Sequence, residues 1–196
     1  MRVIAGTYRS RRLIAPSGLA TRPTSDRLRE TLFNVLATRV DGTVFVDLYA
    51  GSGAVGIEAF SRGASLVCFV DKAPSAMAAI RSNLAALGIH SGFQLESSSV
   101  SAALGRLSTA GIVFLDPPYE AASEYERTLG TIGQKADSLL TADGIVVAEH
   151  SRKSQLAEHY GALQRYRVLE QGDAGLSFYC AVPFDKLRAG SPGLAS

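Results

Sequence analysis

Short apolar runs alternate along most of the chain with segments whose apolar residues recur at helical spacing. The runs expected to form strands cover residues 43–48, 66–71, 93–96, 112–116 and 144–150. The segments expected to form helices between them cover residues 55–62, 75–87, 100–107 and 123–140. This alternation predicts an α/β fold with a doubly wound, mostly parallel sheet and helices on both faces. In such sheets, ligands bind at the carboxyl ends of the strands.

The two ends of the chain depart from this alternation. Residues 2–5 and 11–15 have the pattern of short strands joined by the polar GTYRS, so we expect a small N-terminal β-hairpin arm. After a break at Pro23, apolar residues at helical spacing predict a helix from about residue 24 to residue 38. Near the C-terminus, LQRYRVLEQ and LSFYCAVPF are separated by GDAG, which predicts an antiparallel hairpin.

Length and composition suit one globular domain with a full core. The chain has 196 residues, of which 46% are hydrophobic and 19% charged. We expect an arm over residues 1–22, the main domain over residues 23–184 and a loose tail over residues 185–196. No apolar run approaches the roughly 18 residues of a membrane span, and the arginine-rich N-terminus does not resemble a secretory signal.

The two cysteines, Cys68 and Cys180, each lie among apolar neighbours in strand-like segments. Buried free thiols explain them better than a disulfide, and a metal site needs more ligands than the chain places together. We therefore expect a cytoplasmic protein without a metal, and nothing in the sequence requires more than a monomer.

Charge is spread unevenly, although the net charge is only +2. Residues 1–30 contain seven arginines against two acids, a balance of +5, whereas the rest of the chain has a balance of −3. This asymmetry is typical of a basic arm with a polyanionic partner. A solvated surface segment explains the charge alone equally well.

A glycine-rich loop joins the first strand of the alternating region to its helix. In VFVDLYAGSGAVGIEA, Gly51, Gly53 and Gly56 match the pattern G-x-G-x-x-G, and Asp71 ends the following strand. Glycines allow the backbone to turn tightly beside a ligand, and an acid at the position of Asp71 can accept both hydroxyls of a ribose. Gly56 is also explained by close packing of the helix against the strand.

Two cofactors fit such a loop, a dinucleotide and S-adenosylmethionine. The carboxylate of Asp47, at the end of the first strand, would repel a pyrophosphate but could accept a hydrogen bond from the ammonium of a methionine moiety. No lysine of the kind that binds nucleoside triphosphates follows the loop. The loop therefore favours S-adenosylmethionine.

The apolar run of GIVFLDPPYE stops abruptly at Asp116, and two prolines and an aromatic ring follow it. A stiff Pro-Pro turn would explain this ending. A second interpretation is catalytic: the Asp116 carboxylate and the Pro117 carbonyl accept the two hydrogens of a flat amino group. Pro118 then fixes the path of the chain, and Tyr119 stacks on the base. Such a site would catalyse by positioning and electrostatics.

The glycine loop together with DPPY resembles the class I amino-methyltransferases, whose motif is (D/N/S)-PP-(Y/F/W). IAGTYRSRRL and RPTSDRLRETLFNVL resemble the signature of the bacterial RsmD family, which methylates N2 of a guanine in 16S ribosomal RNA. The resemblance spans residues 2–183. It implies a seven-stranded class I methyltransferase sheet whose last strand is antiparallel, and an N-terminal arm that engages RNA.

The resemblance also assigns expected roles to individual residues. Asp47, Gly51 and Gly53 would bind the methionine end of the cofactor, and Asp71 its ribose. Ser99 would be the counterpart of the residue that meets the adenine, and Thr24 would lie where related enzymes close over the cofactor. The residues expected to act on the target base are Asp116, Pro117, Pro118 and Tyr119; those expected to bind RNA are Arg9, Arg11, Arg12 and Arg22.

The expected reaction is transfer of a methyl group to guanine N2 of 16S ribosomal RNA, of the guanine966-N2 type, in the 30S subunit or an assembly intermediate. The alternatives are N6-adenine of DNA, a glutamine amide, a non-catalytic RNA-binding assembly factor and an NAD-dependent oxidoreductase. One departure from the family concerns Ser10, because the family usually has glycine there, which predicts a different hairpin turn. Tyr49 and Phe33 could face the site or pack in the core, and Glu149 and His150 are expected to be structural.

Overall fold

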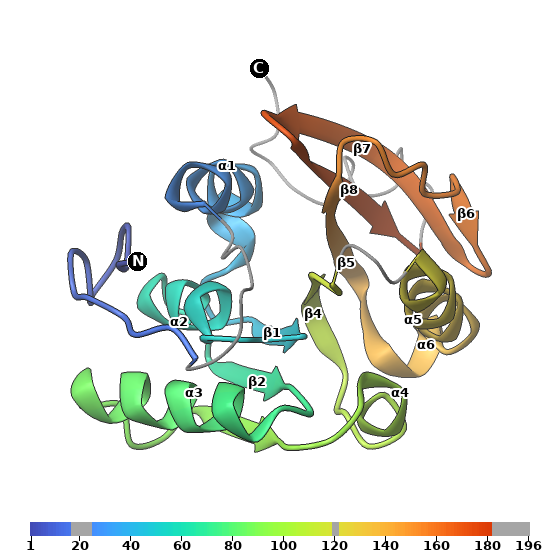
Figure 1. The fold of residues 1–196 in the computed structure, drawn as a ribbon. Helices are drawn as coiled ribbons and strands as arrows, with labels where there is room; N and C mark the ends of the chain where they lie inside the picture. The colour runs from blue at the N-terminus through green and yellow to red at the C-terminus, as the bar shows by residue number, and fades with distance from the viewer. Residues whose placement is uncertain (17–24, 119–121, 182–196) are drawn as a thin grey trace.

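A computed structural model describes residues 1–16, 25–118 and 122–181. Its centre is an eight-stranded sheet in the order β3-β2-β1-β4-β5-β8-β7-β6 (Figure 1). The strands are β1 (Val44–Leu48), β2 (Leu66–Val70), β3 (Phe93–Glu96), β4 (Ala110–Leu115), β5 (Leu140–Ser151), β6 (His159–Tyr160), β7 (Leu163–Gln171) and β8 (Ala174–Cys180). Strands β1 to β5 are parallel, whereas β8 is antiparallel to both of its neighbours.

The mostly parallel sheet and its antiparallel last strand are confirmed, but the prediction of seven strands is wrong by one. The additional strand is β6, in which His159 and Tyr160 pair with Gln164 and Leu163 of β7. Two residues are too few to show a period of two in the sequence, which is why the pattern of side chains did not indicate this strand.

Helices cover both faces of the sheet, as the doubly wound pattern predicts (Figure 1). On one face, α1 (Asp26–Leu36), α2 (Ala54–Ser61) and α3 (Pro74–Ala86) pack on an apolar cluster that includes Phe45, Phe69 and Phe114. On the other face, α4 (Val100–Ala103), α5 (Ala122–Gln134) and α6 (Ala136–Leu139) pack on a second cluster that includes Val46 and Val113. The central strands are therefore buried on both sides, which explains their continuous apolar runs.

Helix ends explain where the predicted boundaries differ from the observed ones. α1 begins at Asp26 because the Ser25 hydroxyl accepts a hydrogen bond from the backbone N–H of Leu28, at 3.1 Å. It ends at Leu36 and continues as a short 3₁₀ turn over Ala37–Arg39. The helix expected over residues 123–140 is divided into α5 and α6, and the one expected over residues 100–107 is shorter.

The N-terminal arm, residues 1–16, is a hairpin with a single antiparallel bridge, between Arg2 and Arg12, instead of two regular strands. The backbone N–H of Val3 donates to the carbonyl of Arg11 at 3.0 Å, and that of Leu13 donates to the carbonyl of Met1 at 3.1 Å. Ser10 has a φ of 68°, in the left-handed region that favours glycine. The turn therefore holds Ser10 in a conformation that a glycine would adopt with less strain.

Both cysteines, Cys68 and Cys180, are free and buried, as predicted. Among the described residues, no helix has the length and apolar character needed to cross a membrane.

Candidate active site

Acidic side chains gather at one edge of the sheet, where the parallel strands end. Leu48 pairs with Leu115 across β1 and β4, and Leu115 pairs with Ala148 across β4 and β5. Asp116 and Glu149 are the next residues on these two neighbouring strands. Asp47 lies within β1, one residue before its end, and Asp71 follows β2 directly. The strand order therefore places the three acids assigned from the sequence, Asp47, Asp71 and Asp116, at the same edge of the sheet as Glu149.

The glycine turn between β1 and α2 is held by hydrogen bonds from its own backbone. Gly51 and Gly53 have φ values of 56° and 75°, which suit glycine in both cases. The N–H of Gly51 donates to Asp71 Oδ2 at 2.9 Å, and Asp71 Oδ1 accepts from the N–H of Ala73 at 2.8 Å. Asp71 thus joins the turn to the start of α3.

The three glycines of the loop serve different purposes. A Cβ added at Gly51 would meet no atom closer than the carbonyl oxygen of Tyr49, at 3.9 Å, so this part of the turn is open. A Cβ at Gly53 would lie 3.0 Å from Ile80, and one at Gly56 would lie 2.3 Å from the ring of Phe69. Gly56 therefore allows α2 to pack closely on β2, and this packing explains why a glycine is needed there.

Asp47 is buried, with an exposed fraction of 2%, on the face of the sheet covered by α1 to α3. Its Oδ2 accepts a hydrogen bond from the N–H of Gly56, at 2.8 Å. Burial raises the pKa of Asp47 to about 8; the hydrogen bond from Gly56 opposes this rise, and the charges of Asp71 and Glu149 add to it. A cation beside Asp47 would favour its charged form.

Asp116 lies immediately after β4, whose last residue is Leu115. Burial is the main cause that raises its pKa well above the ordinary value, and the carboxylates of Glu149 and Asp47 act in the same direction. Pro117 is buried and Pro118 is exposed, whereas Tyr119 lies outside the described residues. A raised pKa at a strand end beside a second carboxyl group is typical of a functional site.

Glu149 was expected to be structural, yet it lies beside Asp116 at the carboxyl end of β5. Its side chain is buried, and its backbone carbonyl accepts a hydrogen bond from the hydroxyl of Tyr125, at 2.9 Å. His150, the next residue, is held within the sheet by contacts with Ser177 Oγ and the carbonyl of Ser151, each at 2.9 Å. The two residues therefore differ: His150 is part of the sheet's packing, and Glu149 borders the acidic edge.

Tyr49 connects the glycine turn to the helix that follows the DPPY segment. It has a φ of 61°, which is unusual for a residue with a side chain. Its hydroxyl donates to Glu124 Oε2 at 2.9 Å and lies 2.8 Å from Thr128 Oγ1, both on α5. Phe33, by contrast, is fully buried and stacks on Phe45, so it belongs to the core.

Ser99 is the N-cap of α4, where its hydroxyl accepts from the N–H of Ala102 at 3.3 Å. A contact of Ser99 with an adenine remains a prediction. Thr24 and Arg22, the other residues expected near the cofactor and the RNA, lie outside the described residues.

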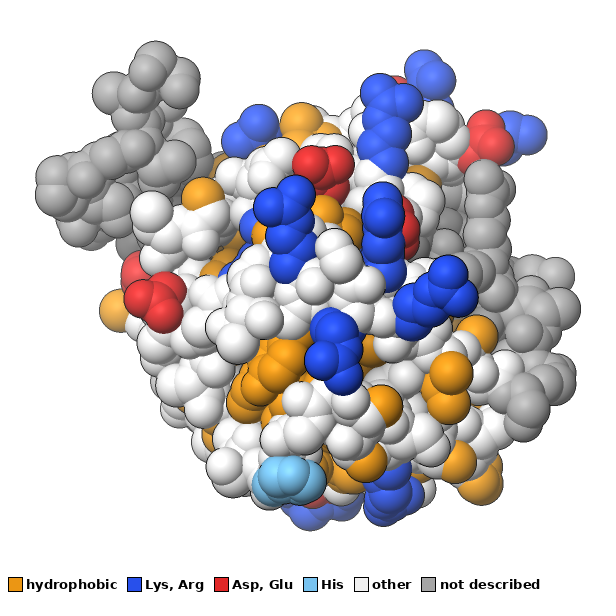
Figure 2. All heavy atoms as spheres, turned by 90° about the vertical axis from the view of Figure 1, so that its left-hand side faces the viewer, with side chains coloured by type: hydrophobic (Ala, Val, Ile, Leu, Met, Phe, Trp, Pro, Cys, Tyr) orange, Lys and Arg blue, Asp and Glu red, His pale blue; other side chains and the backbone are white. Residues whose placement is uncertain are grey.

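Lys and Arg side chains gather on the face of the molecule that carries the arm (Figure 2). Arg9 and Arg12 are exposed there. Arg11 is exposed as well, but its Nη2 donates to the carbonyl of Ala86 at 3.0 Å, at the C-terminal end of α3. Arg11 therefore fastens the arm to α3, a role that its charge did not indicate.

Four buried polar residues that contact the arm were not singled out in the sequence: Arg29, Glu58, Ser61 and Asn83. Each contacts the arm through its side chain. Glu58 has apolar neighbours on both sides in α2, whereas Ser61 is the last residue of that helix and Asn83 follows Arg81 and Ser82 in α3. A lone charged residue in an apolar helix is the signal that could have found Glu58, because buried polar groups need partners.

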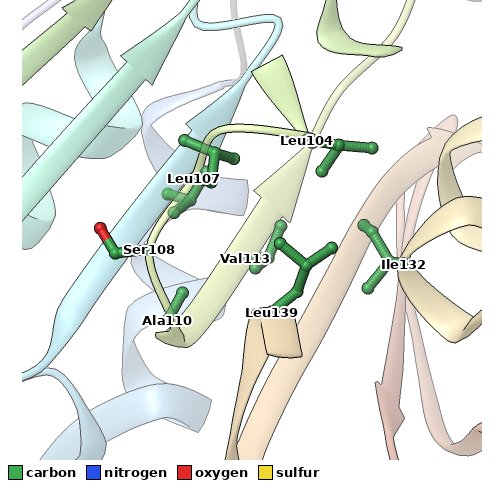
Figure 3. A pocket seen from close by; sticks show the side chains of 8 residues that line it. Leu104, Leu107, Ser108, Ala110, Val113, Ile132 and Leu139 are labelled. Atoms are coloured by element: carbon green, nitrogen blue, oxygen red, sulfur yellow. The ribbon is translucent and has the colours of Figure 1, made fainter. Parts of the chain in front are cut away.

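A small cavity lies on the opposite face of the sheet, between β4 and helices α4 to α6 (Figure 3). Val46, Leu104, Val113 and Ile132 are among its lining residues, and its volume is about 10 Å³. No acidic group lines it. It is therefore a gap in the core packing, separate from the acidic edge.

The residues present fit S-adenosylmethionine. A buried carboxylate, Asp47, suits the ammonium of the methionine end, and the open left-handed turn at Gly51 admits a ligand close to the backbone. Asp71 is partly exposed beside the same turn, and its carboxylate keeps lone pairs for ribose hydroxyls in addition to the two backbone N–H groups.

Comparison with known proteins gives consistent matches. The family described as conserved hypothetical protein 95 matches residues 1–180. The Bacillus subtilis protein named "Putative rRNA methyltransferase YlbH" is 37% identical over 185 residues, which cover 91% of this chain and 98% of that protein. Ribosomal RNA small subunit methyltransferase D of Escherichia coli is 37% identical over 119 residues, 61% of this chain and 60% of that protein. The solved structure titled "Putative methyltransferase yhhF from Escherichia coli" has a TM-score of 0.77 at 28% identity, covering 91% of this chain and 96% of that chain.

Proposed function

The chain belongs to the family described as conserved hypothetical protein 95, and from this premise we propose that it methylates N2 of a guanine in small-subunit ribosomal RNA. S-adenosylmethionine is the methyl donor. Two relatives are named for ribosomal RNA methylation, and one of them for the small subunit. The finer parts of the proposal are the guanine966-N2 type of target, a 30S subunit or assembly intermediate as substrate, and action as a monomer.

One observation supports the chemistry above all others: Asp116 directly follows β4, which pairs with β1, and the glycine turn follows β1. An exocyclic amine on an aromatic base is a poor nucleophile because its lone pair is delocalised into the ring. Two acceptors fixed in space, the Asp116 carboxylate and the Pro117 carbonyl, would orient the amine hydrogens and direct the lone pair outward. Tyr119 would stack on the base.

The cofactor, when bound, supplies an electrophilic methyl group attached to a sulfonium. In the proposal, Asp47 accepts from its ammonium, Gly51 and Gly53 shape the turn that it lies on, and Asp71 binds the ribose hydroxyls. Ser99 and Thr24 complete the set at the adenine side and over the cofactor.

Asp116 also has a part in the proton balance. As N2 gains its methyl group, its remaining hydrogens become acidic and one must leave. A carboxyl group whose pKa is raised by burial and by the neighbouring Glu149 is a better proton acceptor than an ordinary one. Asp116 would therefore hold the released proton until solvent removes it.

The test is methyl transfer from labelled S-adenosylmethionine to small subunits from a strain lacking this modification. We expect label in one ribosomal RNA guanine with the native protein. Asp116→Ala should lower the transfer rate by about 10²–10⁴-fold, because it removes the acceptor that positions the amine. Its affinity for the cofactor should stay close to native. Asp137→Ala, at an exposed position of α6, is the matched control.

Several outcomes would contradict the proposal. Label in DNA or in a glutamine of a protein, with none in the ribosomal RNA, would replace guanine by one of the alternative targets. Equal loss of transfer and of cofactor binding in Asp116→Ala would show that Asp116 has a different role.

A further inference from the structure

The arm and the glycine turn share a single buried residue, Asn83 of α3. It is 2% exposed, and its side chain makes three hydrogen bonds. Oδ1 accepts from the N–H of Ile14 at 2.8 Å, and Nδ2 donates to the carbonyl of Ile14 at 3.0 Å. The other hydrogen of Nδ2 is donated to the carbonyl of Ser52, at 2.9 Å. Ile14 belongs to the arm, and Ser52 lies between the two left-handed glycines of the turn.

Only an asparagine in this orientation satisfies all three groups. Reversing the amide would place Oδ1 against two carbonyl oxygens and leave the N–H of Ile14 facing an NH₂ group. An apolar residue would leave the carbonyl of Ser52 without this donor.

A second contact joins the arm to the same residue of the turn. The hydroxyl of Ser52 donates to the sulfur of Met1, at 3.5 Å. Both ends of the arm, at Met1 and at Ile14, therefore reach Ser52 directly or through Asn83. The position of the peptide between Gly51 and Gly53 thus depends on where the arm lies.

The middle of the arm is fastened to α2, the helix that begins at the turn. Glu58 accepts from the N–H groups of Ile4 and Ala5 at 2.7 and 3.0 Å. Ser61 accepts from the N–H of Tyr8 through its hydroxyl, at 2.9 Å. Gly6 packs so closely that an added Cβ would lie 1.8 Å from the carbonyl oxygen of Ser61. The arm is therefore an ordered part of the domain, and it carries the exposed arginines Arg9 and Arg12.

We propose that Asn83 is a positioning residue through which the docked arm fixes the glycine turn, so that cofactor affinity and RNA binding are coupled. This rests on the proposed function, in which the turn holds the cofactor and the arm engages RNA. Because such coupling is reciprocal, RNA on the arm should raise cofactor affinity by the same factor by which the cofactor raises RNA affinity.

The test is calorimetric titration of the full-length chain with S-adenosylhomocysteine, the demethylated form of the cofactor. Asn83→Ala should bind it about 5- to 20-fold more weakly than the native protein, because the carbonyl of Ser52 loses its donor. Ser82→Ala, at the exposed neighbouring position of α3, should bind it as the native protein does. Gly6→Ala, which lifts the arm from α2 and leaves Asn83 in place, should also weaken binding. If Asn83→Ala does not fold, the affinity of Gly6→Ala for S-adenosylhomocysteine tests the proposal in its place.

Kinetics separate positioning from general destabilisation. Positioning predicts that Asn83→Ala raises KM for S-adenosylmethionine while kcat at saturating cofactor stays near native. It also predicts that unmodified 16S ribosomal RNA raises cofactor affinity about 10-fold in the native protein and much less in the variant. Native affinity for S-adenosylhomocysteine in Gly6→Ala and in any folded Asn83→Ala protein would overturn the inference. Failure of the native protein to bind S-adenosylhomocysteine or S-adenosylmethionine would instead overturn the proposed function.

Discussion

At the scale of single residues, the buried acid Asp47 has the most direct chemical consequence. Its pKa of about 8 means that the free protein holds a proton there at neutral pH. An unfolded chain loses that proton near the ordinary value of 3.8. The contribution of Asp47 to stability therefore falls as pH rises from about 4 to about 8, and is constant above that range. A bound ammonium would favour the carboxylate and offset this loss.

We therefore expect cofactor binding to release a proton. At pH 6.5 the methionine ammonium is protonated and Asp47 is mostly neutral, so binding should release close to one proton from Asp47. Calorimetric titration of S-adenosylmethionine in buffers of different ionisation enthalpy measures this number. Asp47→Asn, which has the same shape, should bind more weakly and release none. Release of one proton by this variant would assign the effect to another group.

Ser10 offers a prediction about stability. It has a left-handed φ of 68° at the turn of the arm, a conformation that costs a non-glycine residue about 1–2 kcal/mol. Ser10→Gly removes this strain but increases the entropy of the unfolded chain, so we expect a net stabilisation of about 0.5 kcal/mol. Thermal or denaturant unfolding at fixed pH measures the change. A lower free energy of unfolding would mean that the serine side chain contributes to the turn.

Whether the role of a residue could be predicted depended on whether its partners lie close to it in the sequence. The glycines of the turn and the acids at the ends of β1, β2 and β4 could be placed from the sequence, because a strand end fixes where nearby side chains lie. The contacts of Asn83 and Glu58 with the arm could not, because their partners there are backbone groups more than fifty residues away. The sequence did not indicate that Glu149 borders the site. Its position beside Asp116 depends on β4 and β5 being neighbours in the sheet, which the pattern of a single strand does not reveal.

At the scale of elements, the arginines of the arm have different roles in the structure, although their charges are the same. Charge alone treated its arginines as equivalent, but Arg11 caps the C-terminal end of α3 whereas Arg9 and Arg12 are exposed. The sequence correctly predicted that the arm folds back on itself as a hairpin. Its attachment to α2 and α3 could not be predicted, because it relies on buried polar groups and not on a pattern of apolar residues.

This difference can be measured in RNA binding. Replacing Arg9 and Arg12 by alanine should lower the slope of log affinity against log salt by about 1.4–1.8, because each phosphate contact contributes about 0.7–0.9. Arg11→Ala should change the slope less and mainly loosen the arm. Lys135→Ala, an exposed position at the end of α5, is the control for surface charge. An unchanged slope in the double variant would show that the arm does not contact RNA phosphates.

At the scale of the whole molecule, the sheet divides the protein into two faces with different roles. The face covered by α1, α2 and α3 supports Asp47, the glycine turn and the docked arm. The other face is apolar and contains the small cavity. Strand alternation predicted this division, whereas the eighth strand, β6, was too short to predict. The arm and the turn are fastened to the same two helices, which places the proposed RNA and cofactor sites in one connected structure.

The central claim is that Asp116 positions a guanine of small-subunit ribosomal RNA for methylation at N2. Mass mapping of 16S ribosomal RNA tests it most directly, in cells whose native gene is replaced by one encoding Asp116→Ala. We predict that one guanine loses one methyl group while all other modifications persist, and that the native gene restores it. A 16S ribosomal RNA with the same modifications in both strains would contradict the claim.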